Sequence, residues 1–275
     1  MTVIAMTREM GSLGKDVALG LAKELGLEIV HHELVERHLA ERMNLGESAV
    51  HRFLEGRPSM MERWKVDAKR LSRYTAEEIL ELAAEGNVII RGWGAAQLLG
   101  DVSHVICVRV CAPMSKRVAE MKQRLGVDDE DTVRSEIRLS DDAHSRAIQR
   151  QFGGNWENPS NYDVVFNTGR IRVDDCIAQL GLLAQSIAYA ETESSLQTLN
   201  DKLVQARVQS VLDTEVADLP YGSGLNAEVA AGAVTLSGIL GVSRELAPTL
   251  SKIRSVDGVI SVENKVMVVR QSYGV

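Results

Sequence analysis

Apolar runs of strand length alternate with helical patterns over most of the chain. Short apolar runs that end in turn residues predict buried strands, and apolar residues that recur every three or four positions predict amphipathic helices. Strands are predicted at 2–6, 28–32, 103–113 and 162–169, and a strand, turn and helix at 86–99. Helices are predicted at 14–27, 114–126, 129–152 and 173–191, and the pattern at 33–85 is helical with breaks near Gly46 and at residues 56–58. Because strands and helices alternate, we expect an α/β fold whose parallel sheet is covered by helices on both faces.

The pattern changes near residue 192. Residues 191–200, ETESSLQTLN, are polar and predict a linker. Beyond them the order is helix, strand, strand, helix, strand, with a hairpin turn predicted at Gly232 and with Val234 and Leu236 facing a core. We therefore expect one domain at residues 1–190 and a second, small α+β domain of αββαβ order at residues 201–271.

Composition narrows the functional classes. The 275 residues are 45% hydrophobic, which suits globular domains with real cores. The formal net charge is −7, so a role in binding nucleic acid is disfavoured. Cys107, Cys111 and Cys176 lack metal-ligand spacing and are interpreted as buried thiols. No secretory leader and no apolar run of membrane length is visible, so we expect a cytoplasmic protein.

The stretch TREMGSLGKDV near the N-terminus carries the clearest chemical signal. It joins a predicted strand to a predicted helix and nearly matches the phosphate-binding loop G-x-x-x-x-G-K-[ST]. Glu9 stands where the first glycine belongs, and Asp16 stands where the serine or threonine belongs. Gly11 and Gly14 can turn backbone amides toward a phosphate, and Lys15 would add a positive charge at the helix N-terminus. The motif alone leaves an ordinary glycine turn open, and Asp16 is either a Mg²⁺ ligand or a carboxylate that favours the helix N-terminus.

Four stretches, taken in order, resemble one family. They are VIAMTREMGSLGKDVALGLAKELG, VIIRGWGAAQLL, VRVCAPMSKRV and RAIQRQFGGNWENPSNYDVVFNTGRI. Over roughly residues 1–187 the chain resembles the cytidylate-kinase-like branch of the P-loop nucleoside monophosphate kinases. In that branch the N-terminal motif resembles SRxxGSGG[RK], so a first glycine is not expected and an acidic residue after the basic one is common. The resemblance implies a P-loop kinase fold and phosphoryl transfer from ATP, with Mg²⁺, to CMP, dCMP or another small phosphate-bearing acceptor.

The resemblance also implies roles for individual residues. ATP would be bound by Arg8, Gly11, Ser12, Leu13, Gly14, Lys15, Asp16, Asn167 and Thr168, and the metal would be held by Asp16. The catalytic cations would be Lys15, Arg138, Arg146 and Arg150, the three arginines lying on a lid helix where Asp141 or Asp142 would orient them. The acceptor would be bound by His31, His32, Trp93 and Arg117.

Each of these roles has a plainer alternative. The lid arginines would equally suit a solvated charged helix, and Thr168 would equally suit a helix N-cap. Trp93 stands where classical cytidylate kinases carry the arginine of a GRD motif, and packing is the commoner use of a tryptophan. Arg91 lies nearby, but a strand neighbour is expected to point to the opposite face. A catalytically weak nucleotide-binding regulatory protein is therefore the alternative to a kinase.

Residues 199–270 resemble a BON domain. The resemblance is carried by GAVTLSG and VDGVISVEN, and the segment contains no paired acid and base. It implies a module for regulation or docking that binds a protein, a ligand or a phospholipid surface. The sequence leaves a homo-oligomer open.

Overall fold

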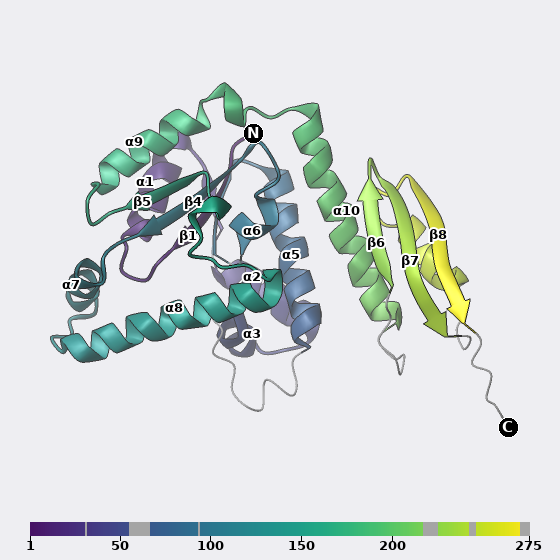
Figure 1. The fold of residues 1–275 in the computed structure, drawn as a ribbon, viewed down its shortest axis with the longest axis horizontal. Helices are drawn as coiled ribbons and strands as arrows, with labels where there is room; N and C mark the ends of the chain where they lie inside the picture. The colour runs from purple at the N-terminus through teal and green to yellow at the C-terminus, as the bar shows by residue number, and fades with distance from the viewer. Residues whose placement is uncertain (31, 55–66, 93, 217–224, 242–245, 270–275) are drawn as a thin grey trace. The chain divides into compact units, whose positions relative to one another are not determined.

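The computed structural model describes residues 1–30, 32–54, 67–92, 94–216, 225–241 and 246–269. These residues form two compact units, Met1–Ser195 and Leu196–Val275, and each is described by itself (Figure 1). His31 and Trp93 lie outside the described residues. In the described part of the chain, no helix combines the length and apolar character needed to cross a membrane.

The first unit is built on a five-stranded parallel sheet. Its strands are β1 (Val3–Arg8), β2 (Glu28–Ile29), β3 (Val88–Arg91), β4 (Val105–Cys111) and β5 (Val164–Asn167), in the order β2-β3-β1-β4-β5. Val3 lies opposite Val88 on one side and Val105 on the other, so β1 is central and its apolar run is buried. The predicted parallel sheet is confirmed. The strand expected at residues 28–32 has only two residues in the ladder, because the chain turns into a helix at His32.

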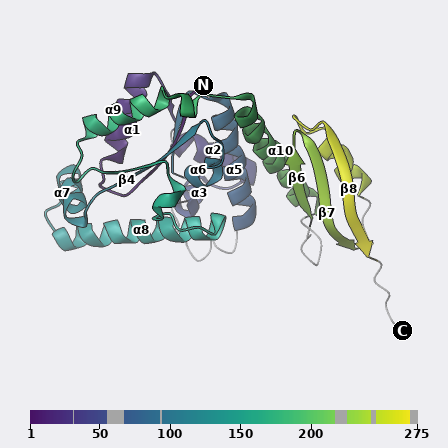
Figure 2. The ribbon, with the colours of Figure 1, turned by 45° about the horizontal axis from the view of Figure 1, so that its top comes forward.

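Helices cover both faces of this sheet (Figures 1 and 2). On one face α1 (Gly14–Leu25) and α9 (Val173–Ala184) share a core with β1, β3 and β4. On the other face α6 (Ala95–Leu99) contacts the sheet, where the Cys107 thiol lies 3.7 Å from the Ala96 carbonyl oxygen. The remaining helices are α2 (His32–Met43), α3 (Glu47–Leu54), α5 (Ala68–Glu85), α7 (Met114–Leu125) and α8 (Glu130–Phe152). The predicted two-sided covering is therefore present.

The polar stretch expected to be a linker is largely helical. The helix α10 spans Glu193–Val216. Its start is fixed by a reciprocal pair of bonds, in which the Ser195 amide donates to the Thr192 hydroxyl (3.1 Å) and the Thr192 amide donates to the Ser195 hydroxyl (3.0 Å). Such reciprocal capping satisfies two amides that a helix start leaves open, so a Ser/Thr-rich stretch marks a helix start here.

The second unit carries a three-stranded sheet of order β6-β7-β8. Beyond α10 its elements are β6 (Asn226–Ala230), β7 (Ala233–Gly241), α11 (Ala247–Arg254) and β8 (Ser261–Val269). β6 and β7 are antiparallel and β7 and β8 are parallel. Val234 and Leu236 are buried in the core of the unit, as predicted.

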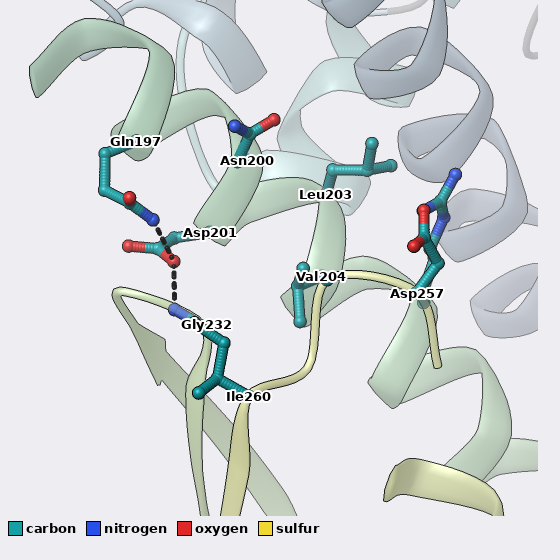
Figure 3. A pocket seen from close by; sticks show the side chains of 10 residues that line it. Gln197, Asn200, Asp201, Leu203, Val204, Gly232, Asp257 and Ile260 are labelled. Atoms are coloured by element: carbon teal, nitrogen blue, oxygen red, sulfur yellow. Dashed lines mark hydrogen bonds and ion pairs between the residues drawn. The ribbon is translucent and has the colours of Figure 1, made fainter. Parts of the chain in front are cut away.

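The β6–β7 hairpin is held by a carboxylate from α10. Its two-residue turn, Ala231 and Gly232, has φ values of 49° and 72°, the signature of a type I′ turn. The Asp201 carboxylate accepts from both turn amides, at 2.8 and 2.9 Å, and also from the Gln197 side chain (Figure 3). These groups border a pocket of about 280 Å³, whose other walls include Ile260, a side chain 80% exposed.

Candidate functional site

The loop between β1 and α1 is held by its own backbone. The Glu9 amide donates to the Val110 carbonyl (3.0 Å), and the Glu9 carbonyl accepts from the Ser12 amide (3.2 Å) and hydroxyl (2.8 Å). Gly11 and Leu13 take positive φ values of 77° and 59°. The residues in the left-handed backbone conformation are therefore Gly11 and Leu13, and not Gly11 and Gly14 as expected from the sequence.

Gly14 is required for space rather than for its φ. It begins α1, and a Cβ on it would lie 2.7 Å from the Arg8 Cβ. A Cβ on Gly11 would lie 2.7 Å from the carbonyl oxygen of Arg117 on α7. Both glycines therefore let the loop pack closely between β1 and α7.

The loop presents donors to an anion. Within the described residues, the amides of Gly11 and Leu13 donate to no protein group, and the amides that open α1 lie beside them. Lys15 is exposed at the start of α1 and forms no ion pair with any described residue. Successive open amides, a helix N-terminus and a lysine are the elements of a phosphate-binding site. Asp16, also exposed, is the acidic residue of that first turn, and no cluster of three potential metal ligands occurs among the described residues.

Glu9, which replaces the expected glycine, anchors the loop to the sheet. Its carboxylate accepts from Arg109 Nη2 (2.8 Å) and the Ala112 amide (3.1 Å), and lies 3.4 Å from Arg117 Nη1. The Glu9 side chain is only 14% exposed, and both arginine side chains are 5% exposed. A glycine would leave two buried guanidinium groups without this partner.

Thr168 anchors the loop from the other side. Its hydroxyl donates to the Ser12 carbonyl oxygen at 2.7 Å and lies 3.3 Å from the Cys111 carbonyl oxygen. Asn167, the last residue of β5, accepts from the Gly169 amide at 3.0 Å and so shapes the turn that follows. The Thr168 hydroxyl therefore holds the loop and caps no helix.

A pocket of about 350 Å³ opens beside the loop. Its floor lies at the carboxyl ends of β1 and β3, where ligands of open parallel sheets bind. Its walls come from α2, α3 and α8, and the lining residues are Thr7, Arg8, Met10, Glu36, His51, Leu54, Arg91, Gly92, Ser140, His144, Ala147, Ile148 and Gln151.

Two arginines, Arg8 and Arg91, lie at the floor of this pocket, and Glu36 lines its wall. Burial, followed by the charges of Arg91 and Arg124, lowers the pKa of Arg8, and Asp16 acts in the opposite direction. No hydrogen bond or ion pair of the Arg8 guanidinium occurs among the described residues. Two guanidinium groups held close together favour an anion between them. Arg91 was expected to point away from the site, but it lines the pocket.

The predicted lid residues on α8 differ in their surroundings, because the arginines are exposed whereas Asp141 is paired. Arg138, Arg146 and Arg150 all lie on α8 and are exposed. Asp141 does not orient them, because its two carboxylate oxygens accept from Arg117 at 2.7 and 2.9 Å. Arg117 is itself buried and is not among the residues that line the pocket. The structure therefore pairs Arg117 with Asp141 rather than bringing Arg117 to the pocket.

Two histidines that were not predicted as site residues from the sequence also line the pocket. His51 Nδ1 lies 2.8 Å from Glu36 Oε1, and His144 stacks on Trp156 with 5.6 Å between ring centroids. Nothing local in the sequence marks either one, because α3 and α8 meet only in the folded chain. The predicted acceptor ligands His31 and Trp93 lie outside the described residues, as does the side chain of His32.

Comparisons with known proteins match the first unit. The sequence model of the cytidylate kinase-like family matches residues 3–170. The cytidylate kinases of Pyrobaculum aerophilum and Pyrobaculum islandicum are 26% and 25% identical to the chain over 177 residues, which is 64% of this chain and 89% of each relative. The crystal structure of an uncharacterized protein from Eubacterium ventriosum aligns with a TM-score of 0.54 at 19% identity and covers 68% of this chain and 99% of that one. This last likeness is one of fold alone.

Proposed function

Since the chain belongs to the cytidylate kinase-like family, we propose that its first unit is an ATP-dependent phosphotransferase of the nucleoside monophosphate kinase type. One observation carries the proposal. A loop with open amides at the N-terminus of α1 lies next to a pocket whose floor holds Arg8 and Arg91. A donor phosphate and an acceptor phosphate would thus be bound at adjoining sites, as phosphoryl transfer requires.

The donor would be ATP, bound by its phosphates at the loop. The open amides of Gly11 and Leu13 would donate to phosphate oxygens, and Lys15 would neutralise their charge. Mg²⁺ fits the donor set, because such sites commonly combine one or two carboxylates with phosphate oxygens, and Asp16 supplies a carboxylate beside the loop. Bound there, the ion would neutralise charge on the transferring phosphate.

The acceptor would be a small molecule that carries a phosphate group, with CMP and dCMP as the first candidates. Arg8 and Arg91 would bind its phosphate, and the polar residues of α3 and α8 would contact the rest of the molecule. An acceptor oxygen would attack the γ-phosphorus as the bond to the ADP oxygen breaks. Arg138, Arg146 and Arg150 would stabilise the negative charge of the transferring phosphate when α8 closes over the site. We propose this role because all three lie on that helix.

The test is a coupled ADP-release assay with CMP, dCMP, UMP and other small phosphate-bearing acceptors. We expect turnover with at least one, and loss of ATP affinity in Lys15→Ala. Lys23→Ala is the matched control, because Lys23 is also exposed on α1 but lies in its last turn, away from the loop. Turnover with no acceptor, despite measurable ATP binding, would remove the kinase proposal.

A second candidate is a nucleotide-responsive regulatory protein with little catalysis. It is favoured by Asp16, whose negative charge close to the phosphates would weaken anion binding wherever no cation lies between them. Calorimetry with ATP, with and without Mg²⁺, measures that effect directly. ATP binding without turnover supports this candidate, and equal ATP affinity in Lys15→Ala and the unchanged chain contradicts both.

For residues 201–271 we propose a BON-type module that either docks the protein to a binding target or regulates the activity of the first unit. Support comes from the αββαβ order of α10 to β8 and from the exposed Ile260 beside the pocket of Figure 3. Flotation of the full chain with phosphatidylglycerol vesicles, compared with Ile260→Asp, tests a phospholipid surface as the docking target. Sedimentation of the same samples without vesicles measures whether the chain forms a homo-oligomer.

A further inference from the structure

We propose that Glu9 is a positioning residue which, through Arg117 and Asp141, couples the phosphate loop to α8. Filling the loop then stabilises the wall of the acceptor pocket. The inference rests on the proposed function to the extent that the loop binds a nucleotide. It assigns to Glu9 a task that the glycine of an ordinary phosphate-binding loop cannot perform.

The network is buried and its charges balance. It contains two arginines, Arg109 and Arg117, and two acids, Glu9 and Asp141. Their side chains are 5%, 5%, 14% and 20% exposed, respectively. Water therefore screens these contacts weakly, and a change at one member is felt by the others.

Arg117 holds the loop and α8 at the same time. Its Nε donates to the Met10 carbonyl oxygen at 2.7 Å, while its Nη1 and Nη2 bind both oxygens of Asp141. The fork geometry of a guanidinium fixes these three bonds relative to one another. Displacement of α8 would therefore move the Arg117 guanidinium away from the loop carbonyl.

Arg109 forms a second connection from Glu9 to the end of α8. While Nη2 binds Glu9, Nη1 donates to the carbonyl oxygen of Trp156 at 3.0 Å, and the guanidinium carbon lies 4.3 Å from the centre of the Trp156 ring. Trp156 follows α8 closely and stacks on His144, which lines the pocket. Glu9 is thus connected to α8 at its middle and just beyond its end.

The ends of both connections lie at the acceptor pocket. Ser140, next to Asp141, lines the pocket, as does His144 one turn further along α8. Met10, whose carbonyl binds Arg117, lines it from the loop side. A ligand that fixes the loop therefore restricts the same residues that shape the pocket, which is a physical basis for coupling between two sites.

The experiment measures hydrogen exchange of α8 with and without the ATP analogue AMP-PNP and Mg²⁺ in the full chain. In the unchanged protein we expect the analogue to slow exchange in the loop and, by about fivefold or more, in α8. In Asp141→Asn the loop response is expected to remain while the response in the middle of α8, around residues 140–144, is lost, because the connection through Arg109 reaches only the residues beyond the end of the helix. Asp131→Asn is the matched control, because Asp131 is an exposed acid on the same helix that does not line the pocket, and the variant should keep the α8 response.

Glu9→Gln gives a second test if Asp141→Asn folds poorly. It keeps the shape of the side chain and removes its charge, so AMP-PNP affinity should fall about tenfold or more and the α8 response should shrink. The coupling is overturned, while the kinase proposal stands, if AMP-PNP binds the unsubstituted protein without slowing exchange in α8. It is also overturned if the response in the middle of α8 survives undiminished in both variants. A coupled α8 response without turnover supports the coupling and removes the kinase, whereas no AMP-PNP binding at all overturns both.

Discussion

Gly11→Ala should destabilise the first unit far more than a second glycine substitution at a similar backbone angle. Gly11 and Gly26 have φ values of 77° and 66°, so an alanine at either position pays a similar conformational cost. That cost is about 1–2 kcal/mol, and it is partly offset because alanine restricts the unfolded chain. Around Gly26 nothing lies within 4 Å of an added Cβ, so the net loss there should be about 1 kcal/mol.

At Gly11 a steric term adds to the conformational one. The new Cβ would stand 2.7 Å from the backbone oxygen of Arg117 and 3.0 Å from Met121 Cγ. The Met121 side chain can move, but the backbone oxygen belongs to α7 and cannot move without shifting that helix. Overpacking of this kind costs about 1–3 kcal/mol, so the total loss should be about 2–4 kcal/mol.

Urea unfolding followed by tryptophan fluorescence measures this difference. All three tryptophans, Trp64, Trp93 and Trp156, precede residue 196, so the signal reports the first unit. We expect the midpoint of Gly11→Ala to lie about 0.5–1.5 M urea below that of Gly26→Ala. ATP affinity should fall at least about tenfold in Gly11→Ala and stay unchanged in Gly26→Ala. Equal midpoints for the two variants would refute the close packing of the loop against α7.

Three further outcomes follow from buried or paired groups. Burial lowers the pKa of His104, so as the pH falls below about 6.5 the unfolded chain takes up a proton before the folded chain does, and the first unit should lose up to about 1.4 kcal/mol per pH unit from this group. Urea titrations of His104→Asn should lack that slope. Asp201→Ala should cost about 1–3 kcal/mol and speed amide exchange in the hairpin at residues 226–240, whereas Asp257→Ala, a side chain 95% exposed, should change little. Burial raises the pKa of Cys107 to about 12, so iodoacetamide at about pH 8 should modify it more slowly in the folded protein than Cys111, which is less buried although burial raises its pKa as well; peptide mass spectrometry would measure the two rates.

The layout of the first unit could be predicted because its signals are local. An apolar run followed by a turn that contains Gly or Pro, and then by a helical pattern, marks β1, β3, β4 and β5 without knowledge of their neighbours. The strand order is not local, since β1 pairs with β3 and β4, which lie far along the chain. The true length of β2 was missed for the same reason. Glu28 and Ile29 pair with β3 in the ladder, and the Val30 amide still donates to the Ile89 carbonyl oxygen before the chain turns into α2.

The site was predicted where it depends on the loop and missed where it depends on tertiary contacts. Glu9 reads as a defect in a phosphate-binding motif until Arg109, 100 residues later, is placed beside it. Arg91 was assigned to the wrong side by strand alternation. The rule was misapplied, because positions 91 and 93 are two apart and alternation along a strand puts such positions on the same face.

The contact between Thr168 and Ser12 has a consequence for the order in which the protein is made. The two residues are 156 positions apart, so at about 5–20 residues per second a ribosome needs roughly 8–30 s to supply the second after the first. The central strand, β1, emerges first, and its two edges stay open until β3 and β4 have been made. A nascent chain halted before residue 168 therefore carries the whole loop sequence without the bond that holds the Ser12 carbonyl in place, and the central strand of its sheet is the one longest exposed to chaperones and to other chains.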